Sequence, residues 1–379
     1  MKYSYAYSHS PIHFYFKQSS RDFVVDEIPL YDFSGDGEHL ILKLRKKNLT
    51  TFEVLKILSS TFGIKEKEIG YAGLKDKNAL TIQHFSLPKK QINFSLLENF
   101  THENIKILDK TFHNNKLKIG HLKGNNFFIR LKKVDNFNYQ KILQVIEKVK
   151  VYGLPNYFSY QRFGKNLDNY KEGQKIVEGK LKLRSKKMSD FLVSAYQSYL
   201  FNQWLSLRIN ISQIIANTEL TKIYEALKFF LKELPQDFKD INFCKSLQKQ
   251  EHFLKVFDGD IFCHYPFGKN FITTKEDLSQ NANRFFMQDI SIMGLLSGAK
   301  MNLAQDLAGF FEKSFIDNKI HSVGQRRYAW IFPKDIAVCY KEEEAQVELK
   351  FFLPKGAYAT NFLREIAHSE IIQKGEDEF

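Results

Sequence analysis

The first 50 residues alternate between apolar and polar positions with the period of a β-strand. Three runs carry this pattern: IHFYFK (12–17), DFVVDEI (22–28) and EHLILKLRKK (38–47). β-branched and aromatic side chains at every second position are typical of strands with one buried face. Pro29 and the turn SGDG (34–37) separate the second and third runs. The pattern therefore predicts a sheet in the first part of the chain.

The pattern then changes to a helical period in TTFEVLKILSSTFG (50–63). Thr50 and Glu53 have the spacing of a capping box, and apolar residues follow at helical intervals. Gly63 stands where a helix C-cap is expected. A second helical pattern, NYQKILQVIEKVK, covers residues 138–150. Between the two helices, KLKIGHLKGNNFFIRL (116–131) predicts two strands that meet at a turn around Gly120 to Gly124.

One turn in this region holds a candidate chemical group. In GYAGLKDKNALTIQHFS (70–86), Asp76 lies between Lys75 and Lys77 in a glycine-marked turn, with strand-like sequence on both sides. One interpretation is a solvated hairpin, which is the common fate of a charged turn. The other is a carboxylate that neighbouring cations keep ionised for chemistry. The stretch alone leaves both interpretations open.

The middle of the chain predicts a different kind of structure. The turn-rich segment GLPNYFSYQRFG (153–164) opens it, and the chain is then mainly helical to about residue 331. The strongest helical pattern is SDFLVSAYQSYLFNQWLSLRI (189–209), with Ser189 as its expected N-cap. Strand patterns return after Pro333, in DIAVCY (335–340) and in AQVELKFFLPKGAYATNFLREIA (345–367). A β-rich start, a helical middle and a β-rich end indicate a sheet domain interrupted by an insertion.

Composition narrows the classes of partner. The 379 residues are 43% hydrophobic and 26% charged, as in a soluble globular protein, and the formal net charge is +13. Such a surplus favours nucleic acid first and an anionic membrane surface second. Aromatic residues reach 15%, and rings on a basic surface can stack on unpaired bases. The N-terminus lacks the apolar region of a signal peptide, and no run approaches the length of a membrane span.

Several chemistries lack their motifs. The three cysteines form no CxxC pair, which gives no support to a disulfide framework or a zinc site and fits a reduced cytoplasmic compartment. The sequence has no GxGxxG turn, no GxxxxGK[ST] phosphate loop and no zinc-deaminase signature. It also has no HExxH and no GxSxG. Cofactor-free and metal-free chemistry by carboxylates, lysines and aromatic side chains remains.

Six segments, in order, resemble the TruD family of tRNA pseudouridine synthases. They are RDFVVDEI, YAGLKDKNALTIQ, HLKGNNFFIRL, GLPNYFSYQRFG, SAYQSYLFNQW and FFLPKGAYATNFLRE. The likeness extends over most of the chain and is weakest at about residues 210–252. Because one short motif could be chance but six in the family's order could not easily be, the resemblance favours chemistry at Asp76 over a solvated hairpin.

The resemblance implies that Asp76 is the catalytic nucleophile and that Lys17, in HFYFKQSSRDF, pairs with it. The carboxylate would act on the sugar of a uridine, either by attack at C1′ or by removal of the 2′ proton through a glycal. Both routes need the ionised form, which nearby cations stabilise. Lys75 and Lys77 would contribute to the local field or contact phosphates.

The resemblance also implies a uridine pocket. Phe23 would form a wall, Asn125 would offer amide hydrogen bonds, and Phe127 would stack on the target base. Tyr358 stands where family members often carry Phe and adds a hydroxyl. The alternative for each aromatic residue is ordinary core packing. The alternative for Asn125 is a left-handed turn residue of a hairpin.

The fold class implied is α+β: the pseudouridine synthase fold, a mixed and largely antiparallel sheet with flanking helices. Residues 1–152 and 332–379 would form this catalytic domain, and residues 153–331 an inserted, mainly helical domain specific to the TruD family. The two would border a basic cleft, which suits the net charge of +13. Candidate phosphate contacts in the insertion are Arg162, Arg326 and Arg327.

The implied substrate is tRNA, with uridine 13 of the D-arm as the target, extruded from the folded RNA at a cost of a few kcal/mol. The implied protein is a cytoplasmic monomer that needs no cofactor. Two other functions stay open: an RNA-binding or RNA-chaperone protein on the same scaffold, and a basic protein of membrane surfaces. The second has no amphipathic basic helix or lipidation motif in its favour.

Overall fold

The computed structural model describes residues 3–16, 19–164 and 166–371. These residues form two compact units. We call residues 12–144 and 333–356 the sheet unit. We call the described residues of 1–11, 145–332 and 357–379 the mixed unit, because it contains both helices and short strands.

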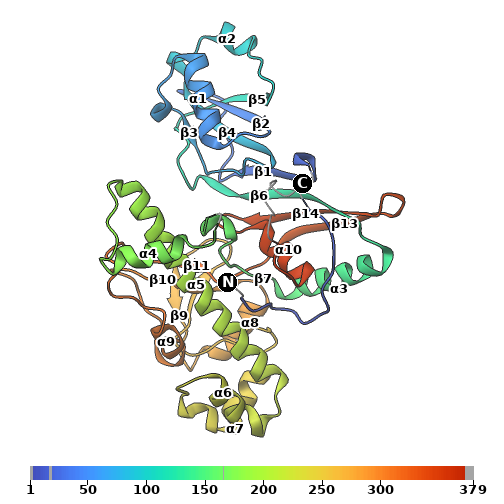
Figure 1. Cartoon of the computed structure of the whole chain (residues 1–379), viewed down its shortest axis with the longest axis vertical. Coiled ribbons are helices and arrows are strands. Elements are labelled where there is room, and N and C mark those ends of the chain that lie inside the picture. Colours follow the sequence, from blue (N-terminus) through green and yellow to red (C-terminus); the bar gives the residue numbers. More distant parts are fainter. Residues whose placement is uncertain (1–2, 17–18, 165, 372–379) are drawn as a thin grey trace. The chain divides into compact units, whose positions relative to one another are not determined.

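The sheet unit is built on one mixed, mainly antiparallel sheet (Figure 1). Its described strands are β1 (Phe23–Pro29), β2 (His39–Lys46), β3 (Gly70–Tyr71), β4 (Leu80–Pro88), β5 (Ile105–His113), β6 (Leu122–Lys132), β13 (Lys334–Lys341) and β14 (Gln346–Pro354). The order is β13-β14-β6-β1-β4-β2-β5, and β3 pairs with the end of β4. The β1–β4 pairing is parallel, and the other pairings are antiparallel. The sequence-based prediction of an α+β fold with such a sheet is confirmed.

The register of the sheet aligns side chains from distant segments on one face. One row of directly paired residues crosses five strands and consists of Lys46, Thr81, Val25, Phe127 and Phe351. Because alternate residues of a strand share a face, residues two positions away from this row lie on the same face. A neighbouring row on that face pairs Glu27 with Asn125 and Asn125 with Leu353.

Helix α1 (Thr51–Phe62) packs its apolar side against the same sheet, in a core that includes Leu42, Leu44 and Leu58. Its capping box forms as predicted: the Thr50 hydroxyl accepts from the Glu53 N–H, and the Glu53 carboxylate accepts from the Thr50 N–H. Gly63 ends the helix with a φ of 67°, a left-handed conformation that glycine adopts without steric cost. The helix α2 (Phe94–Glu98) is a short element of the same unit.

Two local predictions in this unit need correction. Segment 12–17 forms no regular strand among its described residues, where only Tyr15 makes an isolated bridge, to Lys132. The segment 116–131 is one strand preceded by a loop, because the chain turns at Gly120 and β6 has begun by Leu122. Gly124 lies within β6, where an added Cβ would come within 2.2 Å of the Leu353 carbonyl oxygen. A glycine is therefore needed at position 124 because the strands pack closely there, and the residue is not part of a turn.

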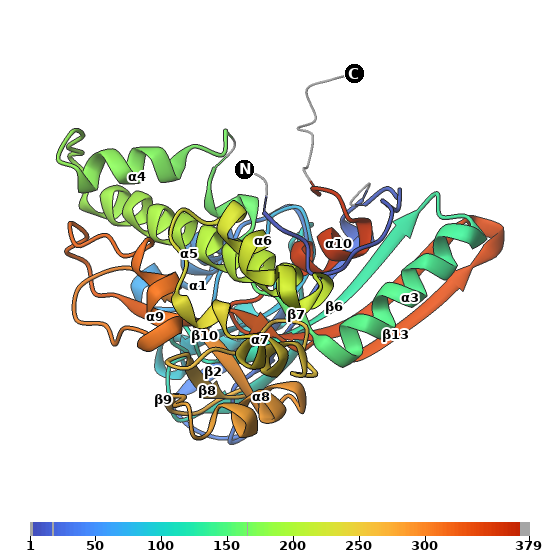
Figure 2. The ribbon, with the colours of Figure 1, turned by 90° about the horizontal axis from the view of Figure 1, so that it is seen from below.

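Helix α3 (Asn136–Tyr152) follows β6 and extends the predicted helix by two residues at each end. Figure 2 shows α3 running beside β13. The Tyr139 and Tyr340 rings stack there with centroids 4.5 Å apart.

The mixed unit is less purely helical than the sequence pattern predicted. Its described helices are α4 (Asn169–Val177), α5 (Lys186–Asn217), α6 (Ile223–Phe230), α7 (Ile241–Gln248), α8 (Leu278–Phe286), α9 (Asp306–Lys313) and α10 (Ala359–Ala367). Its described strands are β7 (Leu154–Pro155), β8 (Ile261–His264), β9 (Asn270–Ile272), β10 (Ile290–Leu296), β11 (Gln325–Tyr328) and β12 (Trp330–Ile331). They form a sheet of order β11-β10-β8-β9 and a separate pair, β12-β7. Short, fully buried strands such as β10 lack the alternation that identifies a strand in sequence.

Helix α5 is the longest described helix of this unit, at 32 residues. It begins earlier than predicted, because the Ser185 hydroxyl accepts from the Met188 N–H and caps it in place of Ser189. Figure 2 shows α4 lying along α5. The close approach needs Gly173, where an added Cβ would come within 2.1 Å of the Leu192 carbonyl oxygen.

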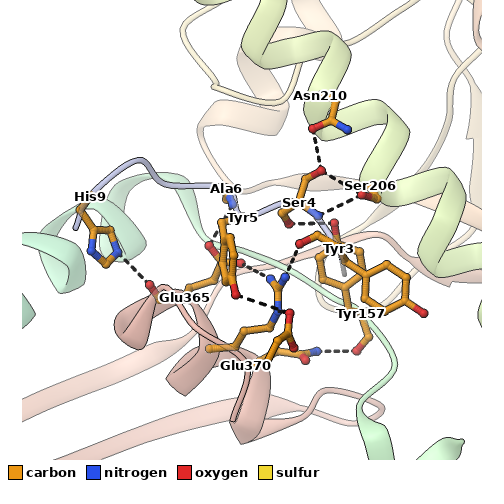
Figure 3. A network of polar contacts seen from close by, with 12 residues as sticks. Tyr3, Ser4, Tyr5, Ala6, His9, Tyr157, Ser206, Asn210, Glu365 and Glu370 are labelled. Carbon is orange, nitrogen blue, oxygen red and sulfur yellow. Dashed lines mark hydrogen bonds and ion pairs between the residues drawn. The ribbon is translucent and has the colours of Figure 1, made fainter. Parts of the chain in front are cut away.

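The first and last described segments, residues 3–11 and 357–371, pack within the mixed unit, whereas the sequence analysis placed them with the sheet domain. Ser4 bonds Ser206 and Asn210 of α5, and the Arg364 guanidinium of α10 donates to the Tyr3 carbonyl oxygen (Figure 3). The contact-based units divide the chain after residues 11, 144, 332 and 356, and the domain boundaries expected from the sequence stay a prediction. Among the described residues, none of the helices has the length and apolar character needed to cross a bilayer.

Candidate active site

The segment that carries Asp76, residues 72–79 between β3 and β4, is called the Asp76 loop below. Neutral hydrogen bonds fix its backbone at three points. The Gly120 N–H donates to the Ala72 carbonyl at 2.8 Å, and the Gln83 side-chain amide donates to the Gly73 carbonyl at 2.6 Å. The Lys75 N–H donates to the Thr51 hydroxyl, at the start of α1, at 3.0 Å. A loop held by β4, α1 and the turn before β6 can hold a reactive side chain in a defined position.

The carboxylate of Asp76 bonds within this loop. Its Oδ1 accepts from the Asn78 N–H at 3.0 Å, and the residue is half-buried. Such a bond to the backbone two residues ahead stabilises the turn and restricts the carboxylate. Lys17, the expected partner of Asp76, lies outside the described residues.

Lys46, at the end of β2, holds the backbone of Asp76. Its buried ammonium donates to the Leu49 carbonyl at 2.6 Å and to the Asp76 carbonyl at 3.3 Å. Burial lowers the pKa of Lys46 to about 8, the negative charge of Asp76 opposes that effect, and the positive charge of Lys75 adds to it. At neutral pH Lys46 is therefore a cationic donor to the backbone of the Asp76 loop.

The Lys75 side chain points into the protein interior, whereas the sequence analysis expected it to contribute to the local field or contact phosphates. Its Nζ lies 2.9 Å from Glu27 Oε2, and the two side chains are only 6% and 1% exposed. The same ammonium donates to the Asn125 side-chain oxygen. This geometry favours a structural tie between the loop, β1 and β6 over a phosphate contact.

Glu27 is the buried centre of that network. Its Oε1 accepts from the His84 backbone N–H at 3.2 Å and lies 3.6 Å from His84 Nδ1. Burial raises the pKa of Glu27, but the hydrogen bonds and charges of His84 and Lys75 outweigh burial and leave the pKa below its ordinary value. The carboxylate is therefore ionised at neutral pH, as a buried partner for Lys75 requires.

The contact with Lys75 also orients Asn125. Because an ammonium can only donate, the amide oxygen of Asn125 must face Lys75, and the amide NH₂ group is turned elsewhere. Asn125 lies within β6 and not in a left-handed turn, so the turn interpretation is not supported. The side chain thus presents donors from the sheet face that it shares with Phe127.

Phe127 and Phe23 form a stack of rings on this face. Their centroids are 6.0 Å apart at an interplanar angle of 13°, and Phe127 stacks on Phe351 at 5.4 Å. Phe16 meets the Phe23 ring edge-on at 5.4 Å. Both Phe23 and Phe127 are buried, so each contributes to the core whatever its role toward a base. Base stacking by Phe127 stays a prediction.

Tyr358 belongs to the mixed unit, at the N-cap of α10. Its ring lies 6.3 Å from that of Phe158 and 5.9 Å from the Arg327 guanidinium. Arg327 also donates to Asn156 and covers the Phe158 ring at 4.0 Å, and burial lowers its pKa to about 10. The guanidinium remains charged at neutral pH in an aromatic setting.

The remaining predicted phosphate contacts differ in availability. Arg326 is committed to a buried ion pair with Glu312, whose side chains are 5% and 2% exposed, which favours a structural role. Arg162 is half-buried and bonds Ser194 at 2.9 Å, and Lys77 is exposed near Glu53 at 3.4 Å. Contact of Arg162, Arg327 or Lys77 with RNA stays a prediction.

The sequence analysis missed Glu27 and Lys46, although strand alternation could have found them. Glu27 continues the buried alternation of Phe23 and Val25, and Lys46 continues that of Leu42 and Leu44. An ionisable side chain at a core-facing position is the signal, because burying a charge is costly unless a partner or a function retains it.

Solved structures share this fold. A crystal structure from Methanosarcina mazei, described as a putative tRNA pseudouridine synthase D, superposes with a TM-score of 0.64 at 21% identity and covers 97% of this chain and 96% of its own. The fold is therefore that of the pseudouridine synthase class.

Sequence comparison defines the family. The family model "tRNA pseudouridine synthase D (TruD)" matches residues 2–187 and 242–366. A protein of Wolinella succinogenes named tRNA pseudouridine synthase D is 50% identical over 370 residues, covering 97% of this chain and 98% of its own. A protein of the same name from Helicobacter pylori strain 26695 is 46% identical, covering 99% and 98%. The chain belongs to the TruD family of tRNA pseudouridine synthases, as its motifs indicated.

The family model leaves residues 188–241 unmatched. This stretch overlaps the segment 210–252, where the resemblance is weakest, and includes the motif SAYQSYLFNQW. The full-length relatives nevertheless align across 97% of the chain or more.

Proposed function

We propose that this chain isomerises uridine to pseudouridine in tRNA, at uridine 13 of the D-arm, with Asp76 as the reactive carboxylate and without a cofactor. The observation that carries the proposal is the Asp76 loop, which Lys46, Thr51 and Gln83 fix through its backbone. The Asn125 amide and the Phe127 ring share one face of the sheet beneath it. Membership of the TruD family supports the reaction class.

The reaction exchanges one bond of the base for another. The N1–C1′ bond breaks, the uracil turns, and a C5–C1′ bond forms while C5 loses its proton and N1 gains one. Asp76 assists either by forming and then releasing an ester at C1′, or by taking the 2′ proton and returning it. A carboxylate restrained by the Asn78 N–H and by its loop loses little entropy on reaching either atom.

The neighbouring residues divide the remaining tasks. The donors of the Asn125 amide suit the uracil carbonyl oxygens, because Lys75 occupies the amide oxygen. Phe127 offers its ring to the extruded base, and Phe23 supports that ring. Lys17 would pair with Asp76. Lys46 and Lys75 act on the position of the loop and have no proposed contact with substrate.

The decisive experiment compares Asp76→Asn with the wild type in tritium release from C5-labelled uridine in tRNA. The expected result is a loss of release of at least about 10³-fold, with unchanged folding by circular dichroism and unchanged tRNA affinity. Release within tenfold of the wild type would remove Asp76 from the mechanism. A wild type that anneals RNA but forms no pseudouridine would favour the RNA-chaperone alternative.

The position modified needs a separate measurement. Pseudouridine mapping in tRNA from cells with and without the gene should show loss at uridine 13 alone in the D-arm. Loss at another position would overturn the assignment of site while leaving the reaction class intact. We further propose a monomeric enzyme, for which light scattering should give a mass near 44.5 kDa.

A further inference from the structure

The sheet unit contains a cavity that the proposed chemistry does not use. Its volume is about 540 Å³, and its walls come from the segment after β1 and from the loop 114–121 before β6. Tyr31, Asp32, His113, Lys116, Lys118 and His121 line it. This volume is in the range of pockets that hold small organic ligands.

An aromatic surface in the cavity is held in place before any ligand binds. The Tyr31 ring stacks on the His113 ring with centroids 5.0 Å apart at 26°. The Tyr31 hydroxyl bonds His121 Nδ1 at 2.8 Å, and Phe33 packs edge-on against Tyr31. A ring fixed from several directions offers a stacking surface at little entropic cost.

Two lysines line the same cavity, and a third lies near its loop. Lys118 is exposed, and Lys116, whose ammonium donates to the Lys67 carbonyl, is half-buried. Lys355 lies close to the same loop, with its ammonium 3.5 Å from the Gly120 carbonyl. Asp32 is the acidic residue of the lining, where it would accept from amino or ring N–H groups of a base. The lining thus offers lysines that suit a phosphate and a carboxylate that suits the edge of a base.

The loop also exposes an apolar side chain. Ile119, next to Lys118, is 75% exposed. A single exposed isoleucine is ordinary on a protein surface. In a loop whose lysines line the cavity, however, it offers an apolar contact of the kind that proteins place against unstacked bases.

The cavity is tied to the Asp76 loop through the backbone. The Gly120 N–H donates to Ala72, the first residue of the Asp76 loop, and the Leu30 N–H donates to the His121 carbonyl. The loop 114–121 is therefore bonded directly to the Asp76 loop, and the segment after β1 is bonded in turn to His121, at the end of that wall. An RNA that delivers a uridine to Asp76 brings its neighbouring nucleotides close to this surface.

We propose that the cavity is a second RNA subsite, in which an unpaired nucleotide of the substrate stacks on Tyr31 while Lys118 and Lys116 bind its phosphate. The inference rests on the proposed function, because it takes the substrate to be a folded RNA held at Asp76. It assigns the loop 114–121 a role in substrate affinity and none in the chemical step.

Two variants test the subsite by steady-state kinetics on tRNA and by tRNA binding as a function of salt. Lys118→Ala removes an exposed cation and should lower the slope of log affinity against log salt by about one. Tyr31→Leu removes the stacking ring and should raise KM by roughly five- to a hundredfold. In both variants kcat should stay within twofold of the wild type.

Matched variants separate the subsite from general effects. Lys65→Ala removes another exposed lysine of the sheet unit, outside the cavity lining, and should leave KM and the salt slope unchanged. Tyr31→Phe keeps the ring and loses only the bond to His121, so it should retain nearly the wild-type KM. If Tyr31→Leu and Tyr31→Phe both lowered kcat, the role of Tyr31 would be structural and the proposal would be overturned.

The outcomes distinguish this inference from the proposed function. An active wild type whose KM and salt slope are unchanged in Lys118→Ala and Tyr31→Leu would overturn the subsite alone. The subsite would also be overturned if the protein bound free adenosine monophosphate and Lys118→Ala weakened that binding without changing the KM for tRNA. The cavity would then serve a small ligand. A wild type that forms no pseudouridine but shows the predicted losses in tRNA affinity would overturn the proposed function and leave the subsite standing.

Discussion

The buried pair between Lys75 and Glu27 gives a quantitative test of how the Asp76 loop is held. The two charged atoms are 2.9 Å apart, and neither side chain is more than 6% exposed. With an effective dielectric constant of about 20, the direct attraction is about 6 kcal/mol, and desolvation of both groups offsets much of it. Removing one partner leaves the other charge buried, so Glu27→Gln should destabilise the protein by about 3–5 kcal/mol.

A double variant separates stability from activity. Glu27→Gln combined with Lys75→Met removes both charges, and its stability should return to within about 1 kcal/mol of the wild type. Its activity should not return, because the ammonium that ties the Asp76 loop to the Asn125 amide is gone. Since a displacement of about 1 Å can cost roughly a hundredfold in rate, we expect kcat to fall by about 10- to 100-fold.

Urea unfolding measures the stability of each variant, and tritium release from tRNA measures its rate. Lys77→Met is the matched stability control, because Lys77 faces Glu53 across 3.4 Å with side chains 52% and 42% exposed. That exposed pair should contribute less than about 1 kcal/mol. A cost below about 1 kcal/mol for Glu27→Gln would refute the buried charge pair. A fully active double variant would refute its role in positioning the loop.

Two further predictions concern buried cations. Because the pKa of Lys46 is lowered to about 8 while the unfolded chain keeps a value near 10.5, the unfolded state binds more protons between these values. The free energy of unfolding should therefore rise as the pH is raised from about 8 to 10.5, because Lys46 loses its proton in the folded protein first. Urea titrations at several pH values measure this rise, and Lys46→Met should remove the part that Lys46 contributes. Arg326→Met should lower the free energy of unfolding by about 3–5 kcal/mol, because it leaves the Glu312 carboxylate without its ion-pair partner. The slope of log tRNA affinity against log salt should stay as in the wild type. A slope reduced by about one would instead indicate that Arg326 contacts a phosphate.

Local signals were sufficient to predict some elements from sequence to within a residue. Helix α1 begins after Thr50 and ends before Gly63, because the capping box and the left-handed glycine act within four residues of the helix ends. The start of α5 was predicted less well, since Ser185 and Ser189 are both acceptable caps and only the first makes the bond. Helix α10 was hidden within a segment interpreted as strand-like.

Features set by long-range contacts left no such signal. The N-terminal segment joins the mixed unit through Ser4 and Asn210, which are 206 positions apart in sequence. The inward turn of Lys75 depends on Glu27 and Asn125, each about 50 residues away, so adjacent charges in the sequence gave no indication of it. Sequence patterns placed Asp76 in a turn between strands, and tertiary contacts determined which lysine holds that turn.

The position of these buried charges explains why this end of the sheet, and not another, carries the candidate site. Along β2 the core-facing residues are Leu40, Leu42 and Leu44, all covered by the α1 core, and then Lys46. The last core-facing position of this strand is therefore an ammonium, which bonds the Asp76 loop, and that loop is bonded in turn to the start of α1. A leucine at position 46 would avoid the desolvation cost that lowers the lysine pKa, and stability alone would favour it. The buried ammonium is therefore explained by the two backbone carbonyls that it holds, those of Leu49 and Asp76, through which it joins the segment before α1 to the Asp76 loop.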